Sequence, residues 1–294
     1  MRLAVLGATG FVGRALVPAL AELGEVVAVS RHAADAPAGR GVRAVAADVV
    51  DGRSLRSALE GADVVYHLVH SLGSPDYRAL DRRAAESVAR EAARAGVSQI
   101  VFLGGLGDDR PDLSPHLRSR LETAEALGGG SVPVTTLRAA VVVGRGSAGF
   151  ETIVALVDRL PAMVAPSWIS TPTQPIALVD VVRYLVGVAG EPAAVGESFD
   201  VGGPEMLTYR DMIERVARIR GRRPLIVEVP VLSPRLSSYW LHLVTPVRAG
   251  VARPLVEGLR NPTVAREQRI RELLPFALTP FDEAAREALE VSFG

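Results

Sequence analysis

The chain has 294 residues, of which 48% are apolar and 22% are charged, and its formal net charge at pH 7 is zero. This length and composition predict a soluble globular protein with a sizeable core and one or two domains. The charge balance does not favour nucleic acid or an anionic membrane as a partner. There is no cysteine, which excludes disulfides, thiol catalysis and cysteine-ligated metal.

Lysine is also absent, because all 33 basic residues other than histidine are arginine. The chain therefore cannot form a Schiff base, build a phosphate-binding loop around a lysine or use lysine as a general base. Arginine stays protonated in proteins and cannot replace a lysine that must release a proton. The five histidines show no metal-ligand spacing with carboxylates, so we expect no metal centre.

No targeting or membrane-spanning segment is expected. The first predicted strand begins at residue 3, which leaves no room for a signal peptide. No uninterrupted apolar run is long enough to cross a bilayer. The sequence therefore predicts a cytoplasmic protein without an integral membrane segment.

The N-terminal stretch contains the most specific motif. The apolar run Leu3–Leu6 predicts a buried strand, and a helical apolar pattern begins soon after it. Three glycines separate the two elements, in the spacing G-x-x-G-x-x-G: Gly7, Gly10 and Gly13. A strand, a glycine turn and a helix in this order open a dinucleotide-binding unit, whose helix N-terminus offers unpaired amides to phosphates. The alternative is a glycine-rich turn that binds no ligand.

Strands and helices alternate through the first half of the chain. Repeated βα units with short joints predict an α/β fold, with a Rossmann-type, doubly wound parallel sheet that binds ligands at the carboxyl ends of its strands. The further predicted strands are Glu25–Ser30, Val42–Ala46, Asp63–Val69, Gln99–Leu103 and Val134–Leu137. The predicted helices are Arg53–Leu59, Tyr77–Ala95 and Pro115–Leu127.

The pattern changes after Val143. We expect residues 1–143 to form the dinucleotide-binding domain and residues 144–294 a smaller C-terminal α+β region that binds substrate, with segments that return to the main sheet. The elements predicted in this region are helices Phe150–Leu160, Asp180–Val188 and Tyr209–Arg220, with Thr208 as a cap, and strands Ser198–Val201 and Leu225–Val229. Pro161–Pro175 is rich in proline, serine and threonine.

The segment Leu232–Leu259 is apolar but is broken by three prolines. Three interpretations are open for it: a substrate lid or pocket wall, a dimer contact, or a segment at a membrane surface. We favour a lid or pocket wall.

Seven short motifs, spread over the first two-thirds of the chain, occur in a familiar order. They are Gly7-Ala8-Thr9-Gly10-Phe11-Val12-Gly13, Ala47-Asp48, Asp63-Val64-Val65-Tyr66-His67-Leu68-Val69-His70-Ser71, Leu103-Gly104-Gly105-Leu106, Leu137-Arg138-Ala139, Thr173-Gln174-Pro175-Ile176 and Asp200-Val201-Gly202-Gly203-Pro204. This order resembles the extended and atypical short-chain dehydrogenase/reductase superfamily. It is most similar to the NmrA-like branch, which includes bacterial NAD(P)H-binding proteins and a group similar to the 39-kDa subunit of complex I.

The resemblance implies that the residue after the second strand helps to choose the cofactor, because an acid there binds the ribose 2′-hydroxyl of NAD. Ser30 and Arg31 stand at that place, and no acid follows until Asp35. Arg31 suits a forked contact with a 2′-phosphate, which favours NADP (NADPH) over NAD; the alternative is a solvated arginine. The implied cofactor-binding residues are Gly7, Thr9, Gly10, Phe11, Val12, Gly13, Ser30, Arg31, Asp48, Leu68 and Val69. Asp48 resembles the residue that contacts the adenine amino group, with a turn cap as the alternative.

The catalytic position departs from the family. Typical members carry Tyr-x-x-x-Lys, in which the tyrosine is the acid/base and the lysine holds the nicotinamide ribose. Here His116 falls at the tyrosine position and Arg120 at the lysine position. The usual serine after the fifth strand is Gly104 or Gly105. Carbonyl reduction by the standard triad is therefore not expected.

Two histidines are candidates for the proton donor, because imidazole titrates near neutral pH. One is His116, with Arg120 fixing the nicotinamide ribose or polarising the substrate; the alternative is that His116 is a surface helix residue. The other is His70, just past the fourth strand at the ligand-binding edge, with a hydrogen-bonded loop histidine as the alternative. His67 is expected to be packed inside the strand.

Three further polar residues are assigned from position alone. Arg138 is expected either to face the pocket or to pair with a buried acid. Gln174 and Glu151 are expected to line the substrate cleft.

Two functions follow from these residues and the resemblance. The first is an NAD(P)H-dependent oxidoreductase of the atypical short-chain dehydrogenase type, which transfers hydride to a small apolar organic substrate without the usual Tyr-Lys pair. The second is a non-catalytic NADP(H)-binding redox sensor or assembly factor of the NmrA-like type. A sugar-nucleotide epimerase or dehydratase is disfavoured, because those reactions need the missing base.

A homodimer through the helix Tyr77–Ala95 is a further expectation, with a solvated arginine-rich face as the alternative.

Overall fold

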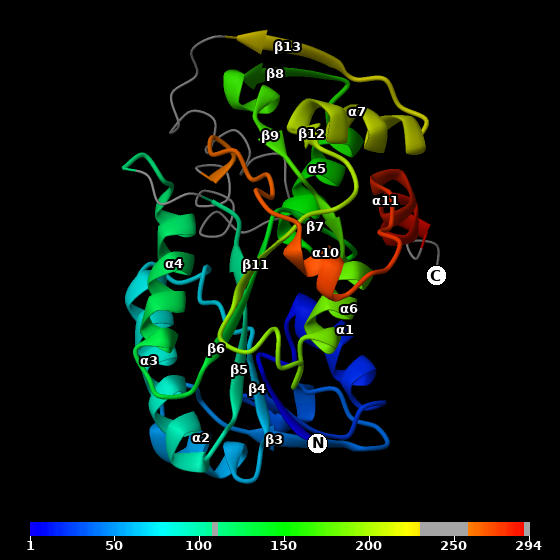
Figure 1. Cartoon of the computed structure of the whole chain (residues 1–294). Helices are drawn as coiled ribbons and strands as arrows, with labels where there is room; N and C mark the ends of the chain where they lie inside the picture. Colours follow the sequence, from blue (N-terminus) through cyan, green and yellow to red (C-terminus); the bar gives the residue numbers. More distant parts are fainter. Residues whose placement is uncertain (108–110, 230–257, 291–294) are drawn as a thin grey trace.

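The computed structural model of the chain describes residues 1–107, 111–229 and 258–290. A seven-stranded parallel sheet forms its centre, with the strand order β11-β6-β5-β4-β1-β2-β3 (Figure 1). Its strands are β1 (Arg2–Leu6), β2 (Glu25–Ser30), β3 (Val42–Ala46), β4 (Val64–His67), β5 (Gln99–Gly105), β6 (Val134–Ala139) and β11 (Ser198–Val201). The order reverses between β1 and β4, as in a doubly wound Rossmann sheet, so the predicted fold class is confirmed.

Helices cover both faces of this sheet, and the alternation of side chains along β1 explains why. Leu3 and Val5 point to the face covered by α1 (Phe11–Leu20) and α6 (Leu178–Gly187). Ala4 and Leu6 point to the opposite face, which packs against α2 (Gly52–Leu59), α3 (Tyr77–Ala95) and α4 (Pro115–Gly128). Because β1 is buried on both faces after Arg2, its residues Leu3–Leu6 are all apolar rather than alternating.

A second core lies in the C-terminal half of the chain. It is built from α5 (Ala148–Arg159), α7 (Tyr209–Ile219) and α11 (Phe281–Glu290), under a small parallel sheet of β8 (Ala162–Pro166) and β13 (Leu225–Val229). Two short strand pairs join this part together: β7 (Val142–Val143) with β10 (Ile176–Ala177), and β9 (Pro172–Thr173) with β12 (Leu207–Thr208). The other elements within the described residues are the 3-10 turns η1 (Ala33–Asp35) and η2 (Ser167–Ser170) and the helix α10 (Arg269–Leu273).

The local predictions that rest on caps and strong periodicity agree with the structure. The helix predicted over Tyr77–Ala95 has those bounds and ends at Gly96 in a left-handed conformation. Thr208 caps α7 in a capping box with Asp211. The strand expected over Asp63–Val69 is shorter, Val64–His67. Residues 230–257, which include most of the apolar segment 232–259, lie outside the described residues.

Strand β8 was not expected in the proline-rich stretch Pro161–Pro175. It forms because its backbone pairs with β13, about sixty residues further along the chain, so the pairing partner rather than local propensity decides its conformation. None of the helices in the described residues is long and apolar enough to cross a membrane.

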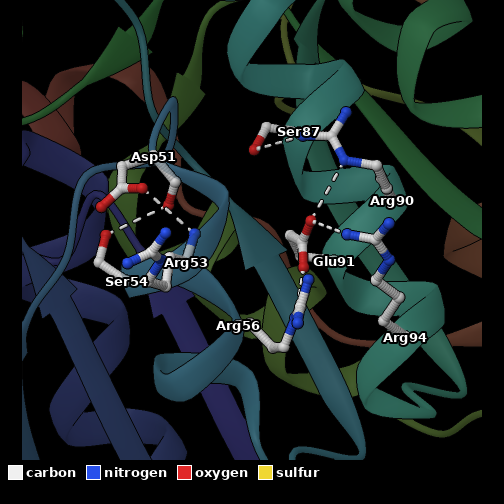
Figure 2. A network of polar contacts seen from close by, with 8 residues as sticks. All are labelled: Asp51, Arg53, Ser54, Arg56, Ser87, Arg90, Glu91 and Arg94. Carbon is white, nitrogen blue, oxygen red and sulfur yellow. Dashed lines mark hydrogen bonds and ion pairs between the residues drawn. The ribbon is translucent and has the colours of Figure 1, made fainter.

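A buried carboxylate holds α2 against α3. The side chain of Glu91 on α3 is 2% exposed and accepts hydrogen bonds from Arg56 of α2, at 2.8 Å, and from Arg90 and Arg94 of its own helix, at 3.1 and 2.8 Å (Figure 2). Burial acts to raise the pKa of Glu91, but the hydrogen bonds from the arginines outweigh it and hold the pKa below its ordinary value. Gly52, at the start of α2, leaves room for this carboxylate, because a Cβ there would lie 3.1 Å from Oε1 of Glu91.

We expect Glu91→Ala to lower the free energy of unfolding by about 2 kcal/mol, because three guanidinium groups lose their acceptor. Urea denaturation at pH 7 measures this. The control is Glu86→Ala, which removes an exposed pair with Arg82 and is expected to cost less than about 0.5 kcal/mol. Because the folded-state pKa of Glu91 is lowered, its contribution is present above the ordinary glutamate pKa and is lost as the pH falls through the folded-state value. An equal loss of unfolding free energy in Glu91→Ala and Glu86→Ala would contradict the role assigned to Glu91.

Candidate functional site

A cleft of about 1060 Å³ runs along the carboxyl ends of the central strands, where the strand order reverses. Its walls come from the turn after β1, the loops after β2, β3 and β4, the ends of β5 and β6, the N-terminal half of α4 and the start of α5. Every residue implied for cofactor binding lines this cleft: Gly7, Thr9, Gly10, Phe11, Val12, Gly13, Ser30, Arg31, Asp48, Leu68 and Val69. The candidates for catalysis line it as well: His70, His116 and Arg120.

The glycine turn brings the start of α1 into direct backbone contact with the end of β1. Gly7 has a φ of +87°, a left-handed conformation that glycine adopts without strain. A Cβ on Gly13 would lie 2.3 Å from the carbonyl oxygen of Gly7 and 2.9 Å from Cα of Ala8, so only glycine fits there.

The same turn fits the diphosphate of a dinucleotide. Helix α1 begins after Gly10 with no side-chain cap and no acid in its first turn, so its first amides keep their capacity to bind an anion. Gly10 lines the cleft, and a Cβ there would approach the carbonyl oxygen of Gly7 to 3.2 Å. The turn is therefore a phosphate cradle with room for backbone contacts only.

The part of the cleft beside the end of β2 presents the cation Arg31. Arg31 is exposed and has no hydrogen-bond or ion-pair partner among the described residues, whereas Ser30 beside it is buried and donates to the carbonyl oxygen of His32. Asp48 accepts a hydrogen bond from the amide of Val50 at 2.9 Å, which is the turn-cap role that was open for it. One carboxylate oxygen of Asp48 is occupied in this way, and the residue still lines the cleft.

The opposite end of the cleft holds a hydrogen-bonded histidine–aspartate pair. Nδ1 of His70 lies 2.7 Å from Oδ2 of Asp81, and Oδ1 of Asp81 accepts a hydrogen bond from the amide of Ser71 at 2.8 Å. The Asp81 side chain is fully buried, and that of His70 is 26% exposed. The ring of His116 stacks on that of His70, with a centroid distance of 5.2 Å, so the structure brings the two candidate proton donors side by side.

Burial and nearby charges set the protonation of these groups. Burial lowers the pKa of His116 to about 3, and the positive charges of His70 and Arg120 act in the same direction. Burial also lowers the pKa of His70, although the hydrogen bond to Asp81 opposes this. Burial acts to raise the pKa of Asp81, but the hydrogen bond from His70 and the charges of His70 and Arg120 hold it below its ordinary value.

Arg120 supplies a fixed positive charge that acts on both histidines. It donates from Nη2 to the carbonyl oxygen of Leu103 at 2.7 Å, and its guanidinium lies 4.7 Å from the ring centroid of Phe102. Its Nη1 is buried with no partner among the described residues. Burial lowers the pKa of Arg120 to about 10, which still leaves it charged at neutral pH. His67 is fully buried and stacks on Phe102, as expected for a packed residue.

Asp81 is the functional candidate that the sequence analysis missed. The signal for it is present, because Asp81 lies on the same helical stripe as the buried residues Ala84, Ala85 and Val88 of α3. Burying an acid on the apolar side of a helix is costly unless the carboxylate has a hydrogen-bond or ion-pair partner inside the protein.

Three other polar residues have structural partners. Arg138 pairs with the buried Asp200 at 2.6 Å, which is one of the two roles expected for it. The expectation that Gln174 and Glu151 line the cleft is wrong, because the side chain of Gln174 bonds to the backbone of Gly203 and that of Glu151 to the backbone of residue 146. Within the described residues, no group of side chains is arranged to hold a metal ion.

Comparison with known proteins places this cleft in a family. Residues 7–133 match the NAD(P)H-binding family. Over 220 residues the chain is 28% identical to the (4-alkanoyl-5-oxo-2,5-dihydrofuran-3-yl)methyl phosphate reductase of Streptomyces griseus, covering 74% of this chain and 73% of that protein. Over 299 residues it is 26% identical to the ceramide reductase of Caulobacter vibrioides, covering 99% and 90% of the two chains.

Other relatives differ more in length. The chain is 25% identical over 239 residues to mitochondrial subunit 9 of the NADH dehydrogenase 1 alpha subcomplex of Arabidopsis thaliana, covering 77% of this chain and 60% of that protein. It spans a quarter of the length of three mycobacterial relatives that are 30% identical over 241 residues. Among solved structures, the NADPH-dependent quinone oxidoreductase of Escherichia coli, complexed with NADPH, aligns with a TM-score of 0.80 at 19% identity, covering 98% of this chain and all of that one.

The fold and the glycine cradle thus define an NAD(P)H-binding protein of the Rossmann type. The match over residues 7–133, together with relatives that include named reductases and a complex I subunit, fits the resemblance to the atypical short-chain dehydrogenase/reductase superfamily that was stated from the sequence.

We expect Gly13→Ala to weaken NADPH binding by at least about tenfold and to lower the melting temperature, because the new Cβ clashes with the backbone of the cradle. Calorimetric titration with NADPH and thermal melting measure the two effects. Gly39→Ala is the matched control, because a Cβ on Gly39 meets nothing within 4 Å. Wild-type affinity in Gly13→Ala would contradict the assignment of the cradle.

Proposed function

We propose that the protein is an NADPH-dependent reductase that acts on a small, largely apolar organic substrate without a tyrosine–lysine pair. The observation that carries this proposal is the His70–Asp81 hydrogen bond, because it supplies a positioned acid/base group in the same cleft as the phosphate cradle. In this proposal residues 1–143 hold the cofactor, and residues 144–294 complete the substrate side. The hydride is the chemistry that the cofactor supplies when it is bound.

His70 is the residue that we assign to the proton. Its Nδ1 donates to Asp81, which fixes one tautomer and leaves Nε2 to exchange a proton with a substrate oxygen. The carboxylate favours the imidazolium form, so His70 binds that proton more readily than an isolated buried histidine would. Its side chain is 26% exposed, so water can return the proton after each turnover.

His116 and Arg120 complete the proposed site in other roles. With a pKa of about 3, His116 is neutral at physiological pH and cannot be the main acid; stacked on His70, it orients that ring. Arg120 keeps its positive charge on this side of the cleft, where it polarises a substrate carbonyl and stabilises negative charge that develops on the oxygen. Aliphatic side chains line the same region, including Leu106, Leu117 and Val141, and suit an apolar substrate.

We expect His70→Asn to lower kcat by about 10²- to 10⁴-fold while NADPH still binds, because the general acid is lost. The wild-type rate of reduction should rise as the pH falls from 8 to below 6.5, since the pKa of His70 is lowered from its ordinary value and the protonated form is required. Asp81→Asn should move this profile to lower pH, because the imidazolium loses its carboxylate. The assay is NADPH consumption with a panel of ketones and enones.

The matched control is His116→Asn. We expect it to keep the shape of the pH profile and to lower kcat much less than His70→Asn. An unchanged profile in His70→Asn together with a collapse of kcat in His116→Asn would instead make His116 the proton donor.

The preference for NADPH over NADH rests on Arg31 in this proposal. We expect Arg31→Ala to raise the dissociation constant of NADPH by about 10- to 100-fold, because a charge-assisted contact with the 2′-phosphate is lost, and to leave that of NADH within about twofold. Calorimetric titration of both cofactors measures this. Arg40→Ala, which removes another exposed arginine, is the control. Equal losses for the two cofactors would contradict the role of Arg31.

A second candidate function is a non-catalytic NADP(H)-binding redox sensor or assembly factor. It is favoured by the histidine and arginine at the usual tyrosine and lysine positions, and by the likeness to a complex I subunit. Such a protein would bind NADPH tightly, would consume none with any member of the substrate panel, and would change its affinity for a partner with the redox state of the cofactor. A cytoplasmic location and a homodimer through α3 remain proposals that accompany either function.

A further inference from the structure

The small sheet of β8 and β13 turns one face away from the protein core. It lies at the opposite end of the molecule from β3 (Figure 1). Met163, Ala165 and Ile226 point inward and pack in the second core. The register pairs Leu225 with Ala162, and Val227 with Val164, on the other face.

The outer face is apolar and exposed. Leu225 is 63% exposed, Val164 50% and Val227 47%, and Ala162 beside them is also exposed. Single exposed aliphatic residues are ordinary, but four that are adjacent in register form a continuous patch, and such patches mark interaction sites. The acid of β13, Glu228, alternates to the other face and lies 3.3 Å from Arg210 of α7, so it adds no charge to the patch.

Arginines border this apolar face. Arg222 and Arg223 precede β13, separated from it by Pro224 alone. Arg223 is exposed and has no ion-pair partner among the described residues. The acid nearby, Asp158, is already shared by Arg220, at 2.6 Å, and Arg222, at 3.7 Å. The chain is neutral overall, but the segment before β13 sets Arg220, Arg222 and Arg223 against this one acid, so the border carries an excess of positive charge.

We propose that the outer face of the β8–β13 sheet docks on an anionic lipid surface. The aliphatic side chains enter the boundary between headgroups and acyl chains, and the bordering arginines contact lipid phosphates. Arginine suits this role because its guanidinium binds phosphate in a forked geometry. A second copy of the chain fits less well, because a symmetric contact through this face would bring the same arginines against one another.

The test is sedimentation of the full-length protein with vesicles of phosphatidylcholine alone, or with phosphatidylglycerol added at one part in three. We expect binding only to the anionic vesicles, and weaker binding at 0.5 M than at 0.1 M NaCl, because salt screens the arginines. The double variant Arg222→Gln/Arg223→Gln should weaken binding by roughly 10- to 30-fold, since each arginine near an anionic surface contributes about fivefold. Leu225→Ser/Val227→Thr should also weaken it, by removing apolar area.

Matched control variants remove arginines or an aliphatic side chain from other parts of the surface. Arg40→Gln/Arg83→Gln takes two exposed arginines from other parts of the surface, and Leu23→Ser removes an apolar side chain that is 45% exposed. Circular dichroism melts establish that each variant is folded. No binding to anionic vesicles, equal binding to both kinds, or an equal loss in the controls would overturn the proposal. So would self-association that Leu225→Ser/Val227→Thr abolishes, since it would assign the face to a second copy.

Discussion

The contact between the start of α1 and the end of β1 is the constraint on which the rest of the site depends. It requires glycine at positions 7 and 13, because one residue is left-handed and the other leaves no space for a Cβ. This contact fixes where the helix amides point, and the reversal of strand order between β1 and β4 places the cleft in front of them. The family match over residues 7–133 begins at this turn.

At the other end of the cleft, electrostatics rather than backbone shape decides what each residue does. His70 and His116 are adjacent rings, yet only His70 has a carboxylate partner. Burial lowers the pKa of both rings and keeps His116 neutral. For His70, the hydrogen bond to Asp81 opposes this effect and favours the protonated form. Arg120 is anchored by Leu103 and Phe102, so its charge stays in place without a salt bridge to Asp81. In the proposed function, His70 carries the proton, His116 is a neutral support for its ring, and Arg120 is a fixed cation.

The sequence predicted the central fold well because that part is encoded locally. The strands of the parallel sheet are short apolar runs, and the helix Tyr77–Ala95 has its own stop signal in Gly96. The glycine turn and both cleft histidines could be found in the same way. What the sequence could not predict depends on distant pairing. Strand β8 exists only against β13, and the partnership of Asp81 with His70 needs α3 to pack beside the loop after β4.

A crystal structure of the protein with NADP(H) tests the central claim most directly. The account predicts that the diphosphate lies on the backbone amides at the start of α1, the 2′-phosphate beside Arg31, and the nicotinamide ring next to His70 and Gly104. A cofactor bound away from the glycine turn, or a nicotinamide ring remote from the His70–Asp81 pair, would contradict it.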